Sequence, residues 1–572
     1  MKNRRTLPYI KDAFPCRAQY LPGEQVSIEI ELHNPMASAA KALVSIAIFS
    51  LENIIACFHE TLELKARKSS RIICTVDPCA SAIGGFGVEI TLTLDNRTAD
   101  TFSTAYDVVP DWSAAPRYGF LSGFYKSDED DRSDVEQLRK YHINAVQFYD
   151  WMYKHHELLP PQDYFTDPLG RELSLVAVRN KIALCHEFGM KAFAYGAVYT
   201  ASREFAAENP ELMLFRNNGE PELFANGWLN IMDISEDSAW PGHIVGQYVR
   251  AVQELDFDGI HMDTYGYPKT AYSMVGGREH LIRLEDEYPR LIDRAKDAVN
   301  AAKPGAGIIF NAVGNWPTTM VAHARQDAVY VEVWDPCSRY IHLHDIIEDA
   351  RQAGQKPVIL AAYLKPFQHS PASAAETALK LTQAVIFASG GYHLELGENN
   401  GVLSDPYYVD YSTIRKPFER TLRSYYDFIV RYSELLYNLN LKDVSMTHAG
   451  GINEEYVFEG GAFSSSGEPG KVWTIVKEMP GAKIIHLINL TGIKSDKWNE
   501  GKRKAPGKVS EIKVRVLDNE RATGVFTASA DEDLCRMKQV PFTTAGSPRG
   551  KVIEFLLPQL DVWRLVYVRT TK

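Results

Sequence analysis

Carboxylates near the ends of short apolar stretches are the residues of this chain that are best placed to do chemistry. Asp150 and Asp263 each end such a stretch, and Glu332 lies between two valines. A carboxylate in apolar surroundings is costly to bury unless it has partners or a function. Two carboxylates brought together can hydrolyse a glycosidic bond. One then attacks or stabilises the anomeric carbon, and the other protonates the leaving oxygen.

Two histidines stand two residues before acidic residues in the same kind of stretch. Because side chains alternate along a strand, His261 shares a face with Asp263, and His393 shares a face with Glu395. Each of these residues also has a simpler interpretation, since a polar residue at a strand end is often a cap or the start of a loop. His393 and Glu395 could be a hydrogen-bonded pair with no part in chemistry.

Aromatic and polar residues at or just after the same stretches complete the set of candidates. Aromatic rings at strand ends suit stacking on sugar rings, although each ring separately could be core packing. The candidates for binding a substrate are Asp150, Trp151, Tyr153, Tyr195, His261, Tyr265, Asn311, Trp334, Lys365, His393 and Glu395.

Metal-dependent chemistry is the rival interpretation of the same residues. His261-x-Asp263 and His393-x-Glu395 could ligate a metal, but this arrangement is unspecific. The first predicted strand, 118–124, has no His-x-His pair of the kind that metal-dependent amidohydrolase barrels place there. We therefore expect no catalytic metal and no cofactor.

The elements that must position these residues are short apolar strands that alternate with amphipathic helical segments. Their count and the size of the region are typical of a (β/α)8 TIM barrel, whose active site lies at the C-terminal ends of the strands. An open doubly wound sheet is the competing fold, but no Gly-rich phosphate loop follows any of the strands. The predicted strands are 118–124, 144–150, 191–199, 258–264, 307–313, 328–334, 357–363 and 391–397.

Alternating polar and apolar residues on both sides of this region predict β domains. The N-terminal part reads as an immunoglobulin-like β-sandwich. After a predicted long helix around 411–439, strands return and indicate a C-terminal antiparallel β-sandwich. The predicted domains are 1–112, 113–442 and 443–572.

Composition limits the partners that we expect. The 572 residues are too many for one hydrophobic core, and the net charge of −11 argues against a nucleic-acid partner. No apolar run is long enough for a membrane span, and seven cysteines, with Cys74 and Cys79 as the nearest pair, form neither a disulfide framework nor a zinc site. The start of the chain has no apolar stretch of a secretory signal. We therefore expect a cytoplasmic monomer or weak oligomer, or an extracellular one if a leader has been removed.

Several of these motifs resemble glycoside hydrolase family 66, which holds endo-dextranases and cycloisomaltooligosaccharide glucanotransferases. The resemblance is carried by DGIHMDT at 258–264, VEVW at 331–334 and HLELGENNGVLSDPYY at 393–408. The segment QFYDWMY at 147–153 also looks like the second strand of that family. The similarity extends over residues 10–572, in the order sandwich, barrel and C-terminal β domain.

The resemblance implies a retaining enzyme that cleaves α-1,6-glucosidic linkages of dextran or isomaltooligosaccharides. It implies that Asp263 is the nucleophile, that Glu332 is the acid/base and that Asp150 binds glucose. Glucanotransferases of the family typically carry a carbohydrate-binding module inserted in the barrel, and no such insertion is evident here. This absence favours dextranase-like hydrolysis. The alternatives are a cycloisomaltooligosaccharide glucanotransferase and, more remotely, a non-catalytic carbohydrate-binding protein.

Overall fold

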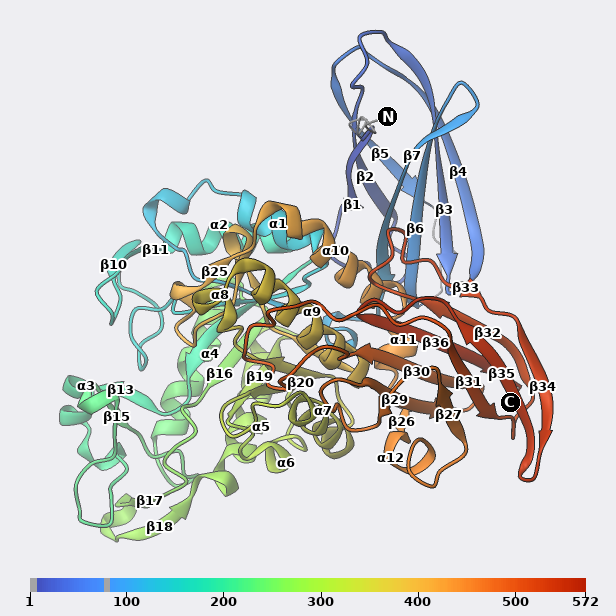
Figure 1. Cartoon of the computed structure of the whole chain (residues 1–572). Coiled ribbons are helices and arrows are strands. Elements are labelled where there is room, and N and C mark those ends of the chain that lie inside the picture. The colour runs from blue at the N-terminus through green and yellow to red at the C-terminus, as the bar shows by residue number, and fades with distance from the viewer. Residues whose placement is uncertain (1–7, 77–82, 572) are drawn as a thin grey trace.

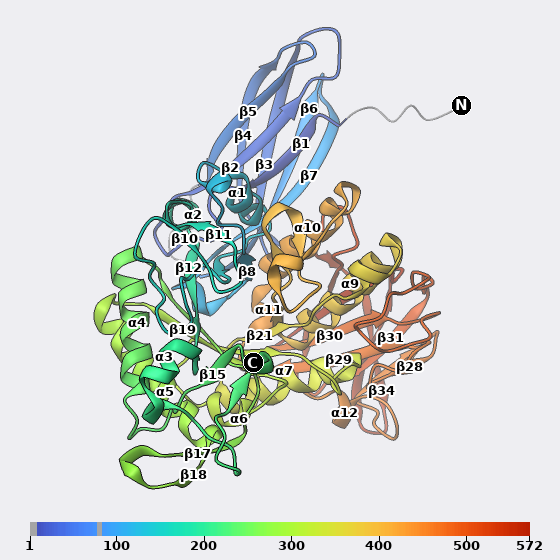
Figure 2. The same cartoon turned by 90° about the vertical axis from the view of Figure 1, so that its left-hand side faces the viewer.

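The computed structural model describes residues 8–76 and 83–571 (Figure 1). Cys79 lies outside the described residues. The first seven residues, which bear on the prediction about a secretory signal, lie outside them too. Three groups of strands follow one another along the chain. In Figures 1 and 2 the N-terminal strands project away from the rest of the molecule, and the C-terminal strands lie beside helices α7 (Tyr340–Gly354) and α9 (Ala372–Ser389).

The N-terminal strands form two sheets that enclose an apolar core. Alternate side chains of the strands, such as Val26, Ile28 and Ile30, are fully buried between the sheets, as their period of two requires. The first sheet has the order β1 (Ile10–Pro15), β2 (Val26–His33), β5 (Ser69–Val76). The second has the order β4 (Asn53–Leu64), β3 (Ala40–Ser50), β6 (Gly84–Leu94), β7 (Arg97–Val108).

A curled sheet of eleven strands among the described residues forms the centre of the molecule. Its first strands pair in parallel in the order β8 (Tyr118–Leu121), β9 (Ala145–Phe148), β12 (Lys191–Ala197), β16 (Gly259–Asp263), β19 (Gly307–Val313), β20 (Ala328–Glu332), β21 (Val358–Ala361), β22 (Gly391–His393). Only two residues separate β22 from β23 (Leu396–Gly397), which pairs in parallel with β8. The same short stretch of chain therefore contacts both ends of the parallel series. The antiparallel strands β24 (Gly401–Val402) and β25 (Ser412–Thr413) complete the sheet.

Side chains on the two faces of this sheet have different neighbours. The inner face carries a packed aromatic and aliphatic cluster that includes Tyr118, Phe193, Ile309 and Tyr330. The outer face packs against helices that connect the strands. These helices include α1 (Ser133–Lys140), α2 (Leu175–Glu187), α4 (Trp240–Leu255), α5 (Leu284–Ala302), α6 (Thr318–Val321), α7 and α9.

Two helical segments differ from the sequence-based expectation. The amphipathic pattern of 279–302 predicts a helix, but the segment begins as strand β18 (His280–Arg283), which pairs with β17 (Thr270–Ser273), and becomes helix α5 only afterwards. The pairing buries Ala271 against Ile282, so a tertiary contact overrides the local helical pattern. The expected long helix around 411–439 is α10 (Lys416–Arg431) followed by the short α11 (Ser433–Tyr437).

The C-terminal strands form two further sheets. One has β28 (Phe463–Ser464) paired with β29 and the order β26 (Lys442–Asp443), β29 (Val472–Met479), β30 (Ala482–Asn489), β36 (Trp563–Thr570), β32 (Ala522–Ala528), β33 (Lys538–Gln539). The other has the order β27 (Tyr456–Glu459), β31 (Ile512–Leu517), β35 (Gly550–Leu557), β34 (Phe542–Ser547). The fully buried Trp563 lies 4.8 Å from the ring of Phe428 in α10, so this part packs directly on the central one.

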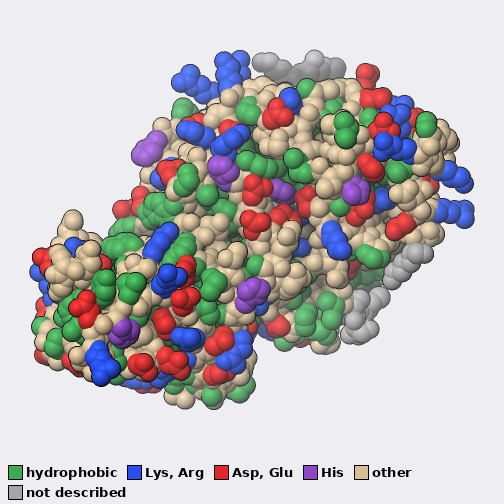
Figure 3. All heavy atoms as spheres, turned by 90° about the horizontal axis from the view of Figure 1, so that it is seen from below, with side chains coloured by type: hydrophobic (Ala, Val, Ile, Leu, Met, Phe, Trp, Pro, Cys, Tyr) green, Lys and Arg blue, Asp and Glu red, His purple; other side chains and the backbone are tan. Residues whose placement is uncertain are grey.

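The surface and the helices carry two further features. No helix among residues 8–76 and 83–571 is both long and apolar enough to cross a membrane. On the face shown in Figure 3, acidic and basic side chains are interspersed, without a large patch of one sign.

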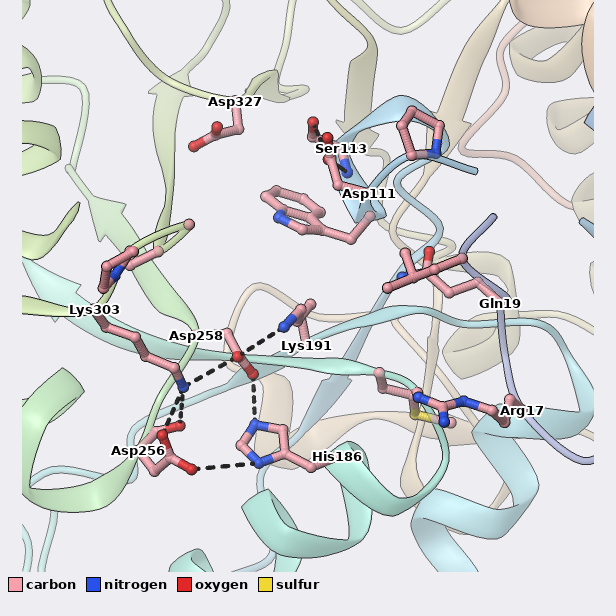
Figure 4. A pocket seen from close by; sticks show the side chains of 18 of the residues that line it. Arg17, Gln19, Asp111, Ser113, His186, Lys191, Asp256, Asp258, Lys303 and Asp327 are labelled. Atoms are coloured by element: carbon pink, nitrogen blue, oxygen red, sulfur yellow. Dashed lines mark hydrogen bonds and ion pairs between the residues drawn. The ribbon is translucent and has the colours of Figure 1, made fainter. Parts of the chain in front are cut away.

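A charged cluster occupies the end of the curled sheet where the strands begin (Figure 4). Asp258, just before β16, is buried and accepts hydrogen bonds from His186 Nε2 at 2.7 Å and Lys191 Nζ at 3.1 Å, and Lys303 Nζ lies 3.2 Å away. Burial alone would raise the pKa of Asp258. The hydrogen bond from His186 and the positive charges of Lys191 and Lys303 outweigh it and hold the pKa well below its usual range. The cluster borders a cavity of about 580 Å³ that is also lined by Arg17.

Replacing Asp258 by asparagine is expected to lower thermal stability by a few degrees, because His186, Lys191 and Lys303 lose their shared carboxylate, at a cost of about 1–3 kcal/mol. A carboxyl with a lowered pKa contributes stability above its unfolded-state pKa and loses it as the pH falls through the folded-state pKa. The difference in melting temperature between wild type and D258N, measured by calorimetry, should therefore be constant near neutral pH and narrow below about pH 4. A difference that widens in acid would contradict this role.

Candidate active site

The ends of three adjacent strands bring Asp263, Asn311 and Glu332 together. Asp263 is the last residue of β16, Glu332 is the last residue of β20, and Asn311 comes from β19 between them. The Asn311 Nδ2 donates to Asp263 Oδ1 at 2.7 Å and to Glu332 Oε2 at 3.0 Å. One nitrogen that reaches both oxygens holds them within about 6 Å of each other, close to the spacing of carboxyl pairs in retaining glycosidases.

Two tyrosines complete the hydrogen bonding of the carboxylates. The Tyr195 hydroxyl donates to Asp263 Oδ2 at 2.8 Å, and the Tyr363 hydroxyl donates to Glu332 Oε1. Because ionised carboxylates only accept hydrogen bonds, Asn311 must turn its NH2 group toward both of them. The Asn311 Oδ1 accordingly has no hydrogen-bond partner within the part of the chain that the structure describes.

Burial and mutual repulsion make the two carboxyls compete for protons. Burial, with the nearby charge of Glu332, raises the pKa of Asp263 to about 7, although hydrogen bonds from Asn311 and Tyr195 oppose the rise. Burial likewise raises the pKa of Glu332 against the hydrogen bonds from Tyr363 and Asn311. Both shifts favour retention of a proton by the pair, the state in which one group can act as an acid and the other as a nucleophile or base.

Asp150 lies beside this pair on the loop that follows β9. Its backbone has a left-handed φ of 48°, and its carbonyl oxygen accepts a hydrogen bond from Arg171 Nη2 at 2.7 Å. Arg171 is in turn held by Asp167, whose Oδ2 lies 2.7 Å from Nε. Burial raises the pKa of Asp150 to about 7 despite the charge of Arg171. The charge of Asp150 also contributes to the raised pKa of Asp263, so the three carboxylates form one electrostatic group.

Four other predicted residues are half-buried or exposed, and the side chain of one of them, Trp334, opposes the rise that burial causes in the pKa of Glu332. Trp334 is half-buried with its ring 5.8 Å from Tyr363, and the exposed Lys365 places Nζ 5.8 Å from the Trp334 ring. Tyr265 is half-buried and hydrogen-bonded to Thr200 at 3.1 Å. Tyr153 is also half-buried.

Two predicted residues lie deeper in the protein. Trp151 is fully buried, donates from Nε1 to the carbonyl oxygen of Tyr195 at 3.2 Å and packs on Phe257 at 4.9 Å. It supports the strand that carries Tyr195 and has no exposed ring. His261 lies two residues before Asp263 on the inner face, with Nδ1 3.2 Å from the Tyr118 hydroxyl. Burial lowers the pKa of His261 to about 3, so its imidazole is neutral.

His393 and Glu395 point away from the three carboxylates. Tyr392 and Leu394 occupy the inner face, so the alternating residues face the helices outside. His393 Nδ1 lies 3.1 Å from Glu395 Oε2, and Glu395 accepts hydrogen bonds from Gln383 of α9 and Tyr426 of α10. The hydrogen bonds of Glu395 link the sheet to two helices, whereas His393 Nδ1 and Glu395 Oε2 lie close to each other without forming a hydrogen bond.

Sequence reasoning did not select three residues that belong to this group. Tyr363 was detectable, because it continues the inward alternation of Ile359 and Ala361 beyond the end of β21. Tyr408, whose ring stacks on Tyr149 at 4.2 Å, comes from a loop after the last strand of the parallel series. Arg171 also comes from a loop. No local sequence pattern indicates these two residues, since their positions depend on loop conformation alone.

Comparison with known proteins assigns the whole chain to one family. The family model named glycosyl hydrolase family 66 matches residues 15–567. The chain belongs to glycoside hydrolase family 66. It is therefore an enzyme of the glycoside hydrolase class, and the family resemblance predicted from its motifs is confirmed. Within the described residues no group of three or more His, Cys, Asp and Glu side chains is arranged to hold a metal ion.

Relatives within the family carry two different names. A cycloisomaltooligosaccharide glucanotransferase of Niallia circulans is 24% identical over 712 aligned residues, which cover 98% of this chain and 72% of the relative. A dextranase of Streptococcus salivarius is 24% identical over 84% of this chain and 67% of its own length. The solved structure of a Paenibacillus sp. cycloisomaltooligosaccharide glucanotransferase complexed with cycloisomaltoheptaose superposes with a TM-score of 0.89 at 22% identity, over 98% of this chain and 99% of that one.

Proposed function

We propose that this enzyme cleaves α-1,6-glucosidic linkages of dextran or isomaltooligosaccharides with retention of configuration, with Asp263 as nucleophile and Glu332 as acid/base. The observation that carries the proposal is the Asn311 amide, which holds the two carboxylates at 2.7 and 3.0 Å from one nitrogen. The spacing that follows suits direct attack by a carboxylate. Inverting enzymes need about 6.5–9.5 Å between the carboxyl groups to admit a water molecule.

The reaction proceeds in two displacements. Asp263 attacks the anomeric carbon while protonated Glu332 donates its proton to the leaving O6 of the glucan, and a glycosyl ester forms on Asp263. Esterification removes the negative charge of Asp263 that had favoured protonated Glu332, so the pKa of Glu332 falls. Glu332 then takes a proton from water, which attacks the anomeric carbon and releases the sugar.

The three domains and the residues around the two carboxylates fit this proposal. We assign the curled sheet and its helices to a (β/α)8 barrel spanning 113–442, between an immunoglobulin-like sandwich at 1–112 and a C-terminal β-sandwich at 443–572. Asp150 is positioned by Arg171 to bind a hydroxyl of the glucose unit whose linkage is cleaved. The half-buried rings of Tyr265 and Trp334 are available to stack on sugars.

Hydrolysis and cyclising transfer share this chemistry and differ in the acceptor. Between β21 and β22 the structure has helices α8 (Pro366–His369) and α9 and no β-rich module. This supports hydrolysis, and the relatives' names keep transfer as the second candidate. Incubation with dextran and with cyclic isomaltooligosaccharides, followed by chromatography, separates the two. Linear products alone are expected, and new cyclic products would replace the hydrolase assignment by the transferase.

Replacing Tyr363 by phenylalanine tests the proton balance of Glu332. The Tyr363 hydroxyl stabilises the ionised form of Glu332, so its loss should raise the pKa of Glu332 further. The alkaline limb of the pH profile of kcat/KM should then move to higher pH, and the maximal rate should fall about tenfold, the scale of one lost hydrogen bond to a charged group. A limb that stays in place or moves to lower pH would contradict this role of Tyr363.

A further inference from the structure

A second cavity opens on the loops that follow β9 and β13 (Thr200–Ser202), at the same end of the curled sheet as the carboxylates. It has a volume of about 570 Å³. Its walls come from the loop after β9, from the start of α3 (Arg203–Glu208) and from the turn between β14 (Leu223–Phe224) and β15 (Leu229–Ile231). Among its lining residues are Lys154, His155, Ser202, Arg203, Asn226 and Trp228.

The cavity combines an aromatic ring with polar groups that have no partner in the protein. Trp228 is half-buried, and His155 packs edge-on against it at 5.4 Å and 88°. His155 is 6% exposed, and its Nδ1 has no hydrogen-bond partner among the described residues. Burial, with the nearby charge of His156, lowers the pKa of His155 to about 3. The imidazole is therefore neutral and offers one donor and one acceptor.

Two further side chains of the lining can bind hydroxyl groups. The Lys154 ammonium lies 4.8 Å over the Tyr153 ring, and its charge acts on Glu204, which also lines the cavity. The Asn226 side chain is exposed. Arg203 is already used, because its Nε donates to the carbonyl oxygen of Gly227 and so holds the turn. The turn keeps Ala225 at a φ of 48°, a conformation that is unfavourable for a residue with a Cβ atom.

Contacts between residues link the wall of this cavity to the surroundings of the carboxylates along two routes. Phe224, just before the turn, stacks on Tyr265 at 3.9 Å, and the charge of Asp263 acts on the Tyr265 hydroxyl. On the other side, Pro168 lines the cavity and directly follows Asp167, which pairs with the Arg171 that holds Asp150. We expect a flexible ligand bound at the carboxylates to extend along these residues toward Trp228.

We propose that this cavity binds a glucosyl unit of the glucan that is remote from the bond being cleaved, with the Trp228 indole stacked on the sugar ring and Lys154, His155 and Asn226 bonded to its hydroxyls. The inference rests on the proposed function. A neutral polyhydroxylated ligand matches the site because it needs an aromatic face together with both donors and acceptors. An isomaltooligosaccharide that is too short to reach the cavity gains nothing from it.

The test compares a long and a short substrate. Replacing Trp228 by alanine should lower kcat/KM on dextran about tenfold, mainly through KM, which corresponds to about 1.4 kcal/mol. It should leave kcat/KM on isomaltotriose within about twofold of wild type. Trp228→Phe keeps an aromatic face and should retain most of the activity on dextran. Asn226→Gly removes the amide while it still permits the positive φ of 55°, and should show a smaller loss of the same kind. Thermal unfolding of each variant identifies any that are misfolded.

A binding measurement separates this inference from the assignment of activity. Electrophoresis of the catalytically weakened Glu332→Gln protein through gels with and without dextran should show retardation by dextran, and the added Trp228→Ala change should abolish most of it. Equal losses on dextran and isomaltotriose, or unchanged retardation, would overturn the remote subsite while the activity stands. Absence of any activity on α-1,6-glucans would instead overturn the proposed function. Retardation that depends on Trp228 would still support a glucan site.

Discussion

Replacing Asp263 by glycine is expected to lower the hydrolysis of isomaltooligosaccharides by at least about 10⁴-fold, the scale seen when a nucleophile is removed from an enzyme. Without the Asp263 carboxylate no glycosyl ester can form. The hydrogen bonds from Asn311 and Tyr195 also lose their acceptor. Steady-state kinetics on isomaltooligosaccharides measure the loss, and thermal unfolding shows whether the variant remains folded.

Azide distinguishes loss of the nucleophile from general damage. The cavity left by D263G admits azide, which can attack the anomeric carbon of an α-glucosyl substrate with a good leaving group. Partial recovery of rate is expected, with a glycosyl azide of inverted, β configuration because only one displacement has occurred. A product of retained configuration, or activity close to wild type without azide, would remove Asp263 from the role of nucleophile.

Asp258 provides a matched control next to the same strand. It directly precedes β16 and Asp263 ends β16, so the two aspartates lie at opposite ends of the curled sheet. D258N is expected to lose stability and keep its kcat, because its partners His186, Lys191 and Lys303 lie far from the carboxylate pair along the strands. D263G is expected to lose its kcat and keep its stability. This contrast separates chemistry from folding.

Replacing Glu332 by glutamine is expected to lower kcat on isomaltooligosaccharides by about 10²- to 10⁴-fold, the range for loss of a general acid. Glutamine has the same shape, and its carbonyl oxygen can still accept the hydrogen bond from Tyr363. Its amide cannot donate a proton to the leaving O6. The raised pKa of Glu332 favours its protonated form in the wild type, and the alkaline limb of the pH profile should disappear in E332Q.

The dependence on the leaving group tests the acid role specifically. A substrate whose aryl leaving group needs no proton should form the glycosyl ester on Asp263 at nearly the wild-type rate in E332Q. Release of the sugar should then be slow, because in the proposed mechanism Glu332 is also the base that activates water. A burst of aryl product followed by a slow steady state is expected in rapid-mixing experiments. Equal losses on activated and natural substrates would point to a structural role for Glu332.

The identity of the family and the arrangement of the strands followed from local patterns. Apolar runs ending in polar residues indicated the strands, and the alternation of side chains placed Asp263 and Glu332 on one face of their strands. The same alternation, applied one step further, indicates Tyr363. These inferences work because the periodicity of a strand is a local property of the backbone, which a buried sheet then preserves.

The alternation of side chains along a strand shows which residues share a face. It does not show which of the two faces of the strand lies on the inner side of the sheet. His393 and Glu395 share a face, as their spacing requires, and that face lies against α9 and α10. Trp151 follows a candidate carboxylate directly, yet its ring is fully buried against Phe257. Only the packing of helices on the sheet decides these cases, because it determines which side of each strand is covered.

The sequence by itself determined the enzyme family and the two acidic residues to which the chemistry is assigned. The tertiary structure decided how they are held. Asn311 bridges both carboxylates, Tyr363 donates to Glu332, and Arg171 reaches Asp150 from a loop. The cavity beside Trp228 also exists only in the folded chain, since its walls come from three separate loops. Contacts between loops depend on the closure of long segments of backbone, which leaves no periodic pattern in the sequence.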